Sequence, residues 1–88
     1  MAQITCKIEN KFGIHARPAS AIVKTASKYQ ADIHIEKDTQ RVSAKSIMGL
    51  MMLAAAHGTT LTIHAEGPDE SEALTALEEL FINKFGEE

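Results

Sequence analysis

The sequence predicts an α+β fold with two layers, in which helices cover one face of an antiparallel sheet and water covers the other. Four short stretches alternate apolar and polar residues, as half-buried strands do, and three longer stretches repeat apolar residues at helical spacing. Their order is β-α-β-β-α-β-α, and every strand has one polar face, which excludes a parallel sheet covered on both faces. The 88 residues suffice for one modest core, so we expect a single domain spanning residues 1–88.

The boundaries of the elements follow from these patterns. The predicted strands cover residues 3–9, 31–36, 41–44 and 60–66. The first helix begins between Ala16 and Pro18 and ends near Lys28, the second begins after Ser46 and ends at His57-Gly58, and the third begins after Asp69 and extends to Phe85. Ser46 and Asp69 are suitable N-cap residues, and Gly58 can adopt the left-handed C-cap conformation.

Composition narrows the class of function. A net charge of -3 makes binding to nucleic acid through phosphate neutralisation unfavourable. The single cysteine, Cys6, points into the core and suits a reducing cytoplasm. The chain shows neither a long apolar run nor a leader, so we expect a cytoplasmic protein without membrane insertion. The four histidines lack the spacing of metal ligands, so no metal and no cofactor are expected.

The stretch Gly13-Ile14-His15-Ala16-Arg17-Pro18-Ala19 carries the candidate chemistry. It places His15 in the turn before the first helix, where main-chain N–H groups converge and the helix dipole is positive. A neutral imidazole with a free lone pair can act there as a nucleophile toward phosphorus. The new negative charge would face the N–H groups of Ala16 and Arg17 and the Arg17 guanidinium. A second interpretation, a polar N-cap in a surface loop, is also compatible with these residues alone.

The second predicted helix has more apolar side chain than one buried face needs. Ile47, Leu50, Met51 and Ala54 share one side of a helical wheel, with Met48 and Met52 beside them and Gly49 facing outward. Two interpretations remain open. The helix is buried on all sides, or its methionines form an exposed patch that docks partner proteins.

Two separated motifs resemble one family, and the likeness extends over essentially the whole chain. Asn10-Lys11-Phe12-Gly13-Ile14-His15-Ala16-Arg17-Pro18-Ala19, followed by Ala44-Lys45-Ser46-Ile47-Met48-Gly49-Leu50, closely resembles the HPr family. Its members are the histidine-containing phosphocarriers of the bacterial phosphoenolpyruvate-dependent phosphotransferase system. The resemblance implies an open-faced sandwich with the sheet order 1-4-2-3.

The resemblance also implies roles for individual residues. His15 would accept a phosphoryl group on Nδ1 (a pros-phosphohistidine) from enzyme I and pass it to an enzyme IIA-type acceptor. Arg17 would stabilise the charge, and Ala16 would donate a main-chain N–H. Such a protein is a stoichiometric carrier rather than an enzyme, and we expect a monomer.

Two further features belong to the same resemblance. Ser46 matches the serine that HPr kinase/phosphorylase modifies in many members, and a phosphate there would change partner affinity through its charge. Met48 and Met52, with Phe12 and Leu53, are predicted to form the docking rim around His15.

The branch of the family stays open at this point. Leu50-Met51-Met52-Leu53-Ala54-Ala55 and Gly67-Pro68-Asp69 resemble the regulatory or nitrogen-linked branch. A regulatory protein that acts by binding is therefore the alternative to a role in sugar uptake. Other classes fit less well. An acylphosphatase-like hydrolase needs a glycine-rich arginine loop and a suitably placed asparagine, and an RNA-binding βαβ module needs aromatic residues on the open sheet face.

Overall fold

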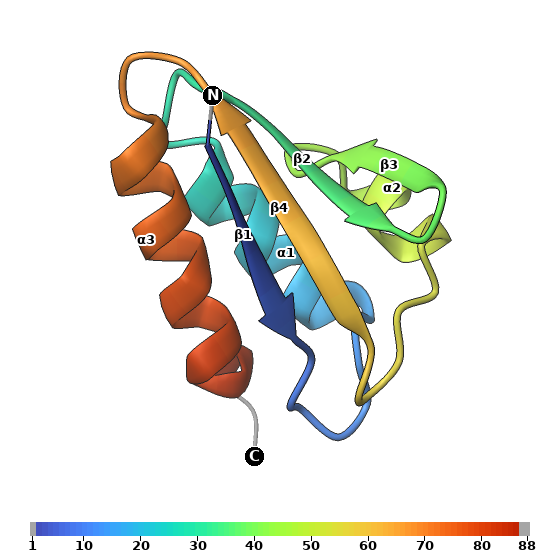
Figure 1. Cartoon of the computed structure of the whole chain (residues 1–88). Coiled ribbons are helices and arrows are strands. Elements are labelled where there is room, and N and C mark those ends of the chain that lie inside the picture. The colour runs from blue at the N-terminus through green and yellow to red at the C-terminus, as the bar shows by residue number, and fades with distance from the viewer. Residues whose placement is uncertain (1, 87–88) are drawn as a thin grey trace.

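The computed structural model describes residues 2–86, within which helices cover one face of a four-stranded antiparallel sheet (Figure 1). The strands are β1 (Ala2–Lys7), β2 (Asp32–Lys37), β3 (Gln40–Ser43) and β4 (Thr60–Glu66). The helices are α1 (Ala16–Ala26), α2 (Ile47–Met52) and α3 (Glu70–Ile82), followed by the 3-10 turn η1 (Lys84–Gly86). The predicted fold class is confirmed, and so is the sheet order β1-β4-β2-β3.

The alternation of the strands decides which face of the sheet is buried. Along β4, Leu61, Ile63 and Ala65 are buried, and the residues between them lie on the open face. The register places Ile63 opposite Ile4 of β1 and Ile35 of β2, so apolar side chains of neighbouring strands pack together. The helices complete this core with the buried side chains Ala19, Ile22, Ala26, Ala73, Leu74, Leu77 and Phe81.

The second helix is shorter than predicted. It ends at Met52 rather than at His57-Gly58, because Ala54 adopts a left-handed conformation with φ +52°. The Lys37 ammonium donates to the carbonyls of Leu53 (2.9 Å) and Ala54 (3.4 Å), which satisfies main-chain acceptors at this helix end. Residues 53–59 therefore form a loop that leads to β4.

The packing of α2 differs from the prediction at Gly49. This residue does not face outward, because α2 lies against β3 and a Cβ on Gly49 would come within 3.2 Å of Val42 Cβ. The absence of a side chain at this position lets the helix approach the strand.

Asp69 has the predicted N-cap position of α3 but a different partner. Its carboxylate makes no capping hydrogen bond and accepts instead from the main-chain N–H groups of Gln30 (2.8 Å) and Ala31 (2.9 Å). These hydrogen bonds favour the charged form, and the N–H of Gln30 contributes most to holding the pKa of Asp69 below its ordinary value. The side chain thus ties the start of α3 to the connection between α1 and β2.

Candidate functional site

The loop between β1 and α1 is held in place by the loop that precedes β4. Ile8 donates its N–H to the Thr59 carbonyl (2.9 Å) and accepts from the N–H of Gly58 (2.8 Å). Further along, Ile14 donates its N–H to the Ala55 carbonyl (2.9 Å). Main-chain contacts therefore fix both ends of residues 8–14, and this position does not depend on flexible side chains.

Asn10 and Gly13 shape the interior of that loop. Asn10 is the one polar side chain among residues 2–86 that is fully buried, at 0% exposure, and its Nδ2 donates to the Gly13 carbonyl at 2.7 Å. Gly13 has φ +69°, and a Cβ there would lie 2.5 Å from the Ala55 oxygen. Only glycine allows this close approach at a positive φ. Sequence reasoning missed the role of Asn10, although an asparagine in a glycine-containing turn was the available signal.

His15 is the N-cap residue of α1. Its main chain is extended (φ -110°, ψ -167°) and its carbonyl accepts the N–H of Ala19 at 2.9 Å. The side chain makes no capping hydrogen bond and is half-buried, and its Nε2 atom is shielded from solvent.

The first turn of α1 supplies the other predicted groups. Ala16 and Arg17 are exposed and lie at the positive end of the helix, where N–H groups lack partners within the helix. The buried Pro18 contributes no N–H, which is tolerated in a first turn. No acidic residue occupies this turn, so the end of α1 is open to an anion.

Phe12 contacts the His15 ring directly. The two rings are perpendicular, with centroids 6.1 Å apart, in an edge-to-face arrangement. The Lys11 ammonium lies 5.6 Å from the centroid of the Phe12 ring, within the range of a cation–π contact. Phe12 is nevertheless 71% exposed, so the contact with His15 lies at the surface.

The methionines of α2 are exposed, so the interpretation of a helix buried on all sides is wrong. Met48 is 74% exposed and Met52 68%, whereas Leu50 faces the core. The helix α2 packs against α1, and His15 is the N-cap residue of α1. The exposed methionines therefore belong to the helix next to α1. Leu53, predicted in the docking rim, is only 1% exposed. Leu53 is the C-cap residue of α2, and its side chain lies in the core on the same side of the helix as Leu50. It therefore takes no part in the exposed surface.

Ser46 is confirmed as the N-cap of α2. Its Oγ accepts the N–H of Gly49 at 3.0 Å, and its main chain is extended. The side chain is half-buried.

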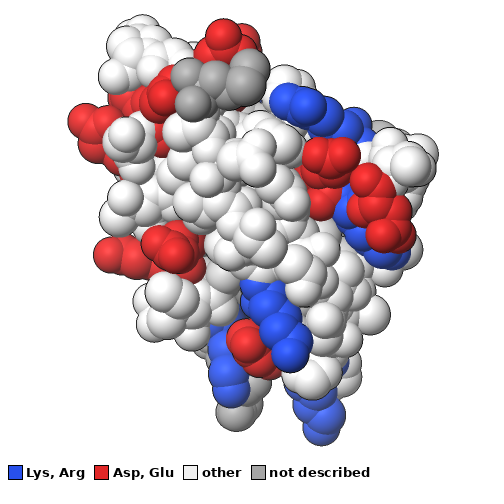
Figure 2. Space-filling view, viewed as in Figure 1, with Lys and Arg blue, Asp and Glu red and all other residues white. Residues whose placement is uncertain are grey.

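Charge is distributed unevenly over the molecule. Figure 2 shows acidic side chains along α3, while basic side chains lie at the lower end of the view, around the end of β1 and the loop that follows it. Residues 70–82 contain four Glu and no Lys or Arg, whereas Lys11 and Arg17 flank His15. The His15 end is thus locally basic in a chain of net charge -3.

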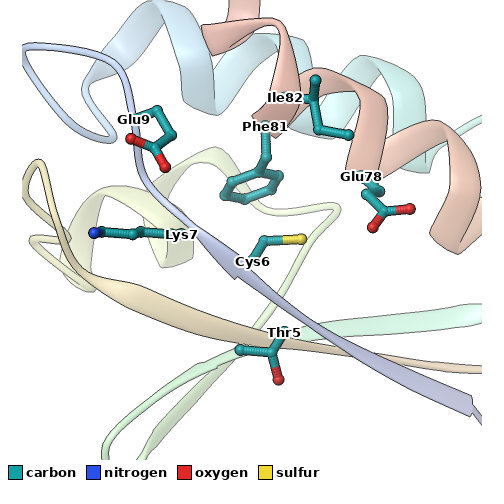
Figure 3. Close-up of a pocket in the computed structure, with 7 residues that line it drawn as sticks. All are labelled: Thr5, Cys6, Lys7, Glu9, Glu78, Phe81 and Ile82. Atoms are coloured by element: carbon teal, nitrogen blue, oxygen red, sulfur yellow. The ribbon is translucent and has the colours of Figure 1, made fainter.

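A recess away from His15 lies along the free edge of β1, between that strand and α3 (Figure 3). It measures about 320 Å³, and Cys6 points into it toward Glu78 and Phe81. Burial, assisted by the Glu78 charge, raises the pKa of the Cys6 thiol to about 11. A thiol that stays protonated at neutral pH is a poor nucleophile, so Cys6 is unreactive in the folded chain.

Within residues 2–86, no three His, Cys, Asp or Glu side chains lie close enough together to hold a metal ion. His34 and His64 lie on the open sheet face, where His64 Nε2 and Glu36 Oε1 are 2.8 Å apart. Across the same residues, every helix falls short of the length and apolarity needed to cross a bilayer.

Comparison with known proteins points to one family. The family model described as "PTS HPr component phosphorylation site" matches residues 2–83. Phosphocarrier protein HPr of Treponema pallidum is 52% identical over 84 residues, which cover 96% of each chain. The crystal structure of HPr from Thermoanaerobacter tengcongensis has a TM-score of 0.96 and 51% identity, covering 100% of this chain and 99% of that one.

A regulatory relative is also similar. The crystal structure of Bacillus subtilis Crh, described as an intertwined dimer with a swapping domain, has a TM-score of 0.77 and 43% identity, covering 96% of this chain and 97% of that one. The HPr proteins named above are thus more similar to this chain than Crh is, in identity and in structure.

Proposed function

This chain belongs to the HPr family, the phosphocarriers of the phosphotransferase system, and we propose that His15 is the residue on which it carries the phosphoryl group. The observation that carries the proposal is the setting of this side chain. A half-buried imidazole belongs to the N-cap residue of a helix, its Nε2 is shielded, and the first turn beside it contains no acidic residue. These features favour Nδ1 as the acceptor atom.

The chemistry of each transfer is an exchange at phosphorus. The Nδ1 lone pair forms a nitrogen–phosphorus bond while the bond between phosphorus and the donor breaks, and the donor keeps that electron pair. The N–H groups of Ala16 and Arg17 and the Arg17 guanidinium then stabilise the phosphoryl oxygens. Transfer to an acceptor reverses these steps and restores the neutral ring. Because positioning and charge stabilisation are what such a reaction needs, the chain acts as a carrier and not as an enzyme.

The proposed partners are phosphorylated enzyme I as donor and an enzyme IIA-type protein as acceptor. Met48, Met52 and Phe12 offer them flexible or aromatic apolar contacts beside His15. Lys11 and Arg17 add positive charge on the same side, which speeds encounter with an acidic surface. We place these transfers in the cytoplasm.

Intact-mass spectrometry tests the carrier role. The protein is incubated with enzyme I and phosphoenolpyruvate, beside His15→Ala and the matched control His57→Ala, which removes an exposed histidine that makes none of the main-chain hydrogen bonds holding the His15 loop. We expect one acid-labile phosphate on the wild type and on His57→Ala and none on His15→Ala. Unmodified wild type, with an enzyme I that phosphorylates another HPr, would contradict the proposal. ATP-dependent labelling at Ser46 alone would indicate the regulatory alternative.

Ser46 is proposed as a regulatory phosphorylation site, with HPr kinase/phosphorylase as the modifying enzyme. A phosphate at the start of α2 adds about two negative charges next to the methionines that dock partners. Ser46→Asp keeps an N-cap acceptor and adds charge, whereas Ser46→Ala removes the cap without adding charge. We expect the aspartate variant to raise the KM for phosphorylated enzyme I more than the alanine variant does. Equal values would exclude the electrostatic mechanism.

The protein is further proposed to act as a monomer. All six residues of β1 pair with β4 of the same chain. The inner edge of this strand is therefore paired without a second copy of the chain. Sedimentation equilibrium over a range of concentrations tests the proposal, and a stable dimer like that described for Crh would overturn it.

A further inference from the structure

We propose that Phe12 is a positioning residue that holds the His15 ring with Nδ1 directed outward, an inference that rests on the phosphocarrier role of His15. The perpendicular contact between the two rings carries it, with centroids 6.1 Å apart. An exposed residue of a docking surface needs no such contact, and Met48 is equally exposed on a different element.

The main chain that carries Phe12 is fixed on both sides. Asn10 precedes it, is fully buried and donates through Nδ2 to the Gly13 carbonyl, while the N–H of Gly13 donates back to the Asn10 carbonyl at 3.3 Å. The next residue, Ile14, is held by the Ala55 carbonyl. Phe12 thus projects from a closed turn, and its ring has a defined place relative to His15 although most of its surface is in water.

The orientation of the His15 ring decides which nitrogen meets a donor. A half-turn of the imidazole about the bond between Cβ and Cγ exchanges Nδ1 with Cδ2 and Nε2 with Cε1, and the ring torsion of histidine is a soft, roughly two-fold one. Such a turn would replace Nδ1 by a carbon where the donor arrives and would move Nε2 from its shielded position. The edge-to-face contact with Phe12 opposes that rotation in the proposed arrangement. An edge-to-face pair contributes about 0.5 to 1.5 kcal/mol, which corresponds to about a 2- to 12-fold preference for the held orientation.

Lys11 gives the aromatic ring a second function in the same arrangement. Its ammonium lies over Phe12, 5.6 Å from the centroid, so the ring also keeps a cation near the site. The Phe12 ring thus contacts both His15 and a cation of the same loop.

The test compares Phe12→Ala, Phe12→Leu and Phe12→Tyr with Met48→Ala as the matched control. Met48 has nearly the same exposure, lies in the same docking surface and is not an aromatic neighbour of His15. NMR of the unphosphorylated proteins measures the ring-proton shifts and relaxation of His15, and steady-state transfer from phosphorylated enzyme I measures kcat and KM separately. Urea denaturation checks that every variant is folded.

Phe12→Ala and Phe12→Leu are expected to shift and broaden the His15 ring signals, to lower kcat by at most about 2- to 12-fold, and to place a detectable fraction of phosphate on Nε2. Phe12→Tyr, which keeps the ring, should restore wild-type behaviour. Met48→Ala should raise KM and leave kcat and the His15 signals unchanged. The inference fails if Phe12→Ala changes KM alone and leaves the His15 ring signals as they are in the wild type.

The NMR measurement does not require phosphorylation, so it separates this inference from the proposed function. If the wild type accepts no phosphate while Phe12→Ala still mobilises the His15 ring, the carrier role is wrong and the positioning contact is real. If the wild type is phosphorylated and the ring is equally ordered in Phe12→Ala, the positioning role is wrong.

Discussion

Replacing Gly13 with alanine should destabilise the fold and displace His15 together. At φ +69° an alanine costs about 1 to 2 kcal/mol relative to its preferred conformations, of which about 0.4 to 1 kcal/mol is offset because alanine orders the unfolded chain. The larger effect is steric. The new Cβ would lie 2.5 Å from the Ala55 oxygen and 2.9 Å from Ala56 Cα, so the loops must separate and the hydrogen bond from Ile14 to Ala55 is lost, at about 1 kcal/mol. We expect a total loss of about 1 to 3 kcal/mol.

Urea denaturation measures this loss, and Gly58→Ala is the matched control. Gly58 also has a positive φ, +90°, but a Cβ there would meet no atom within 4 Å. Its substitution should cost only the conformational part, about 0.5 to 1.5 kcal/mol. At about 1 kcal/mol per molar of urea, the two midpoints should differ by about 1 M, and phosphate transfer to His15 should slow in Gly13→Ala alone. Equal midpoints for the two variants would refute the close approach as the reason for glycine at position 13.

Three further outcomes follow from single residues. Ala54→Gly should raise the free energy of unfolding by up to about 1 kcal/mol, visible as a higher Tm, because Ala54 holds φ +52° at a strain cost that glycine avoids; a lower Tm would contradict this. Since the folded-state pKa of Asp69 is lowered from 3.8, its contribution to stability is present above pH 3.8 and is lost as the pH falls through the lowered value. Stability measured from pH 5 to pH 2 should therefore fall less steeply in Asp69→Asn than in the wild type, and parallel curves would exclude the role of the carboxylate. Cys6, with a pKa of about 11 against an ordinary 9.0, should resist iodoacetamide at pH 8 until urea unfolds the chain; rapid alkylation of the native protein would show that burial does not protect it.

The strands and the core were predictable because their signal is local. In a sheet with one wet face, each apolar residue alternates with a polar one, and the pattern in residues 60–66 is enough to identify β4 and its buried side chains. The amphipathic spacing that predicts α1 and α3 is of the same kind. Ser46 as an N-cap could be predicted too, because its bond to Gly49 spans only three residues.

Two of the features that sequence reasoning missed, the partners of Asp69 and the end of α2, depend on contacts distant in the chain. The carboxylate of Asp69 serves Gln30 and Ala31, which lie 39 and 38 residues away, rather than its own helix. The end of α2 depends on Lys37, which lies in β2, and on the left-handed conformation of Ala54, which helix propensity does not predict. Leu53, which was predicted in the docking rim, has helical φ and ψ and follows the buried Leu50 by three residues, so helical spacing alone places it on the buried face.

The early end of α2 also explains how the His15 site is built. In a helix continued to His57, the Ala55 carbonyl would accept from the N–H of residue 59 and would be directed along the helix axis. The observed loop frees that carbonyl to accept from Ile14, and it frees residues 58 and 59 to pair with Ile8. The hydrogen bonds that position His15 therefore exist because α2 stops at Met52. The same break leaves Met52 at the exposed end of the helix. One local conformation at Ala54 thus serves both parts of the site, the fixed loop that presents the imidazole and the apolar surface beside it.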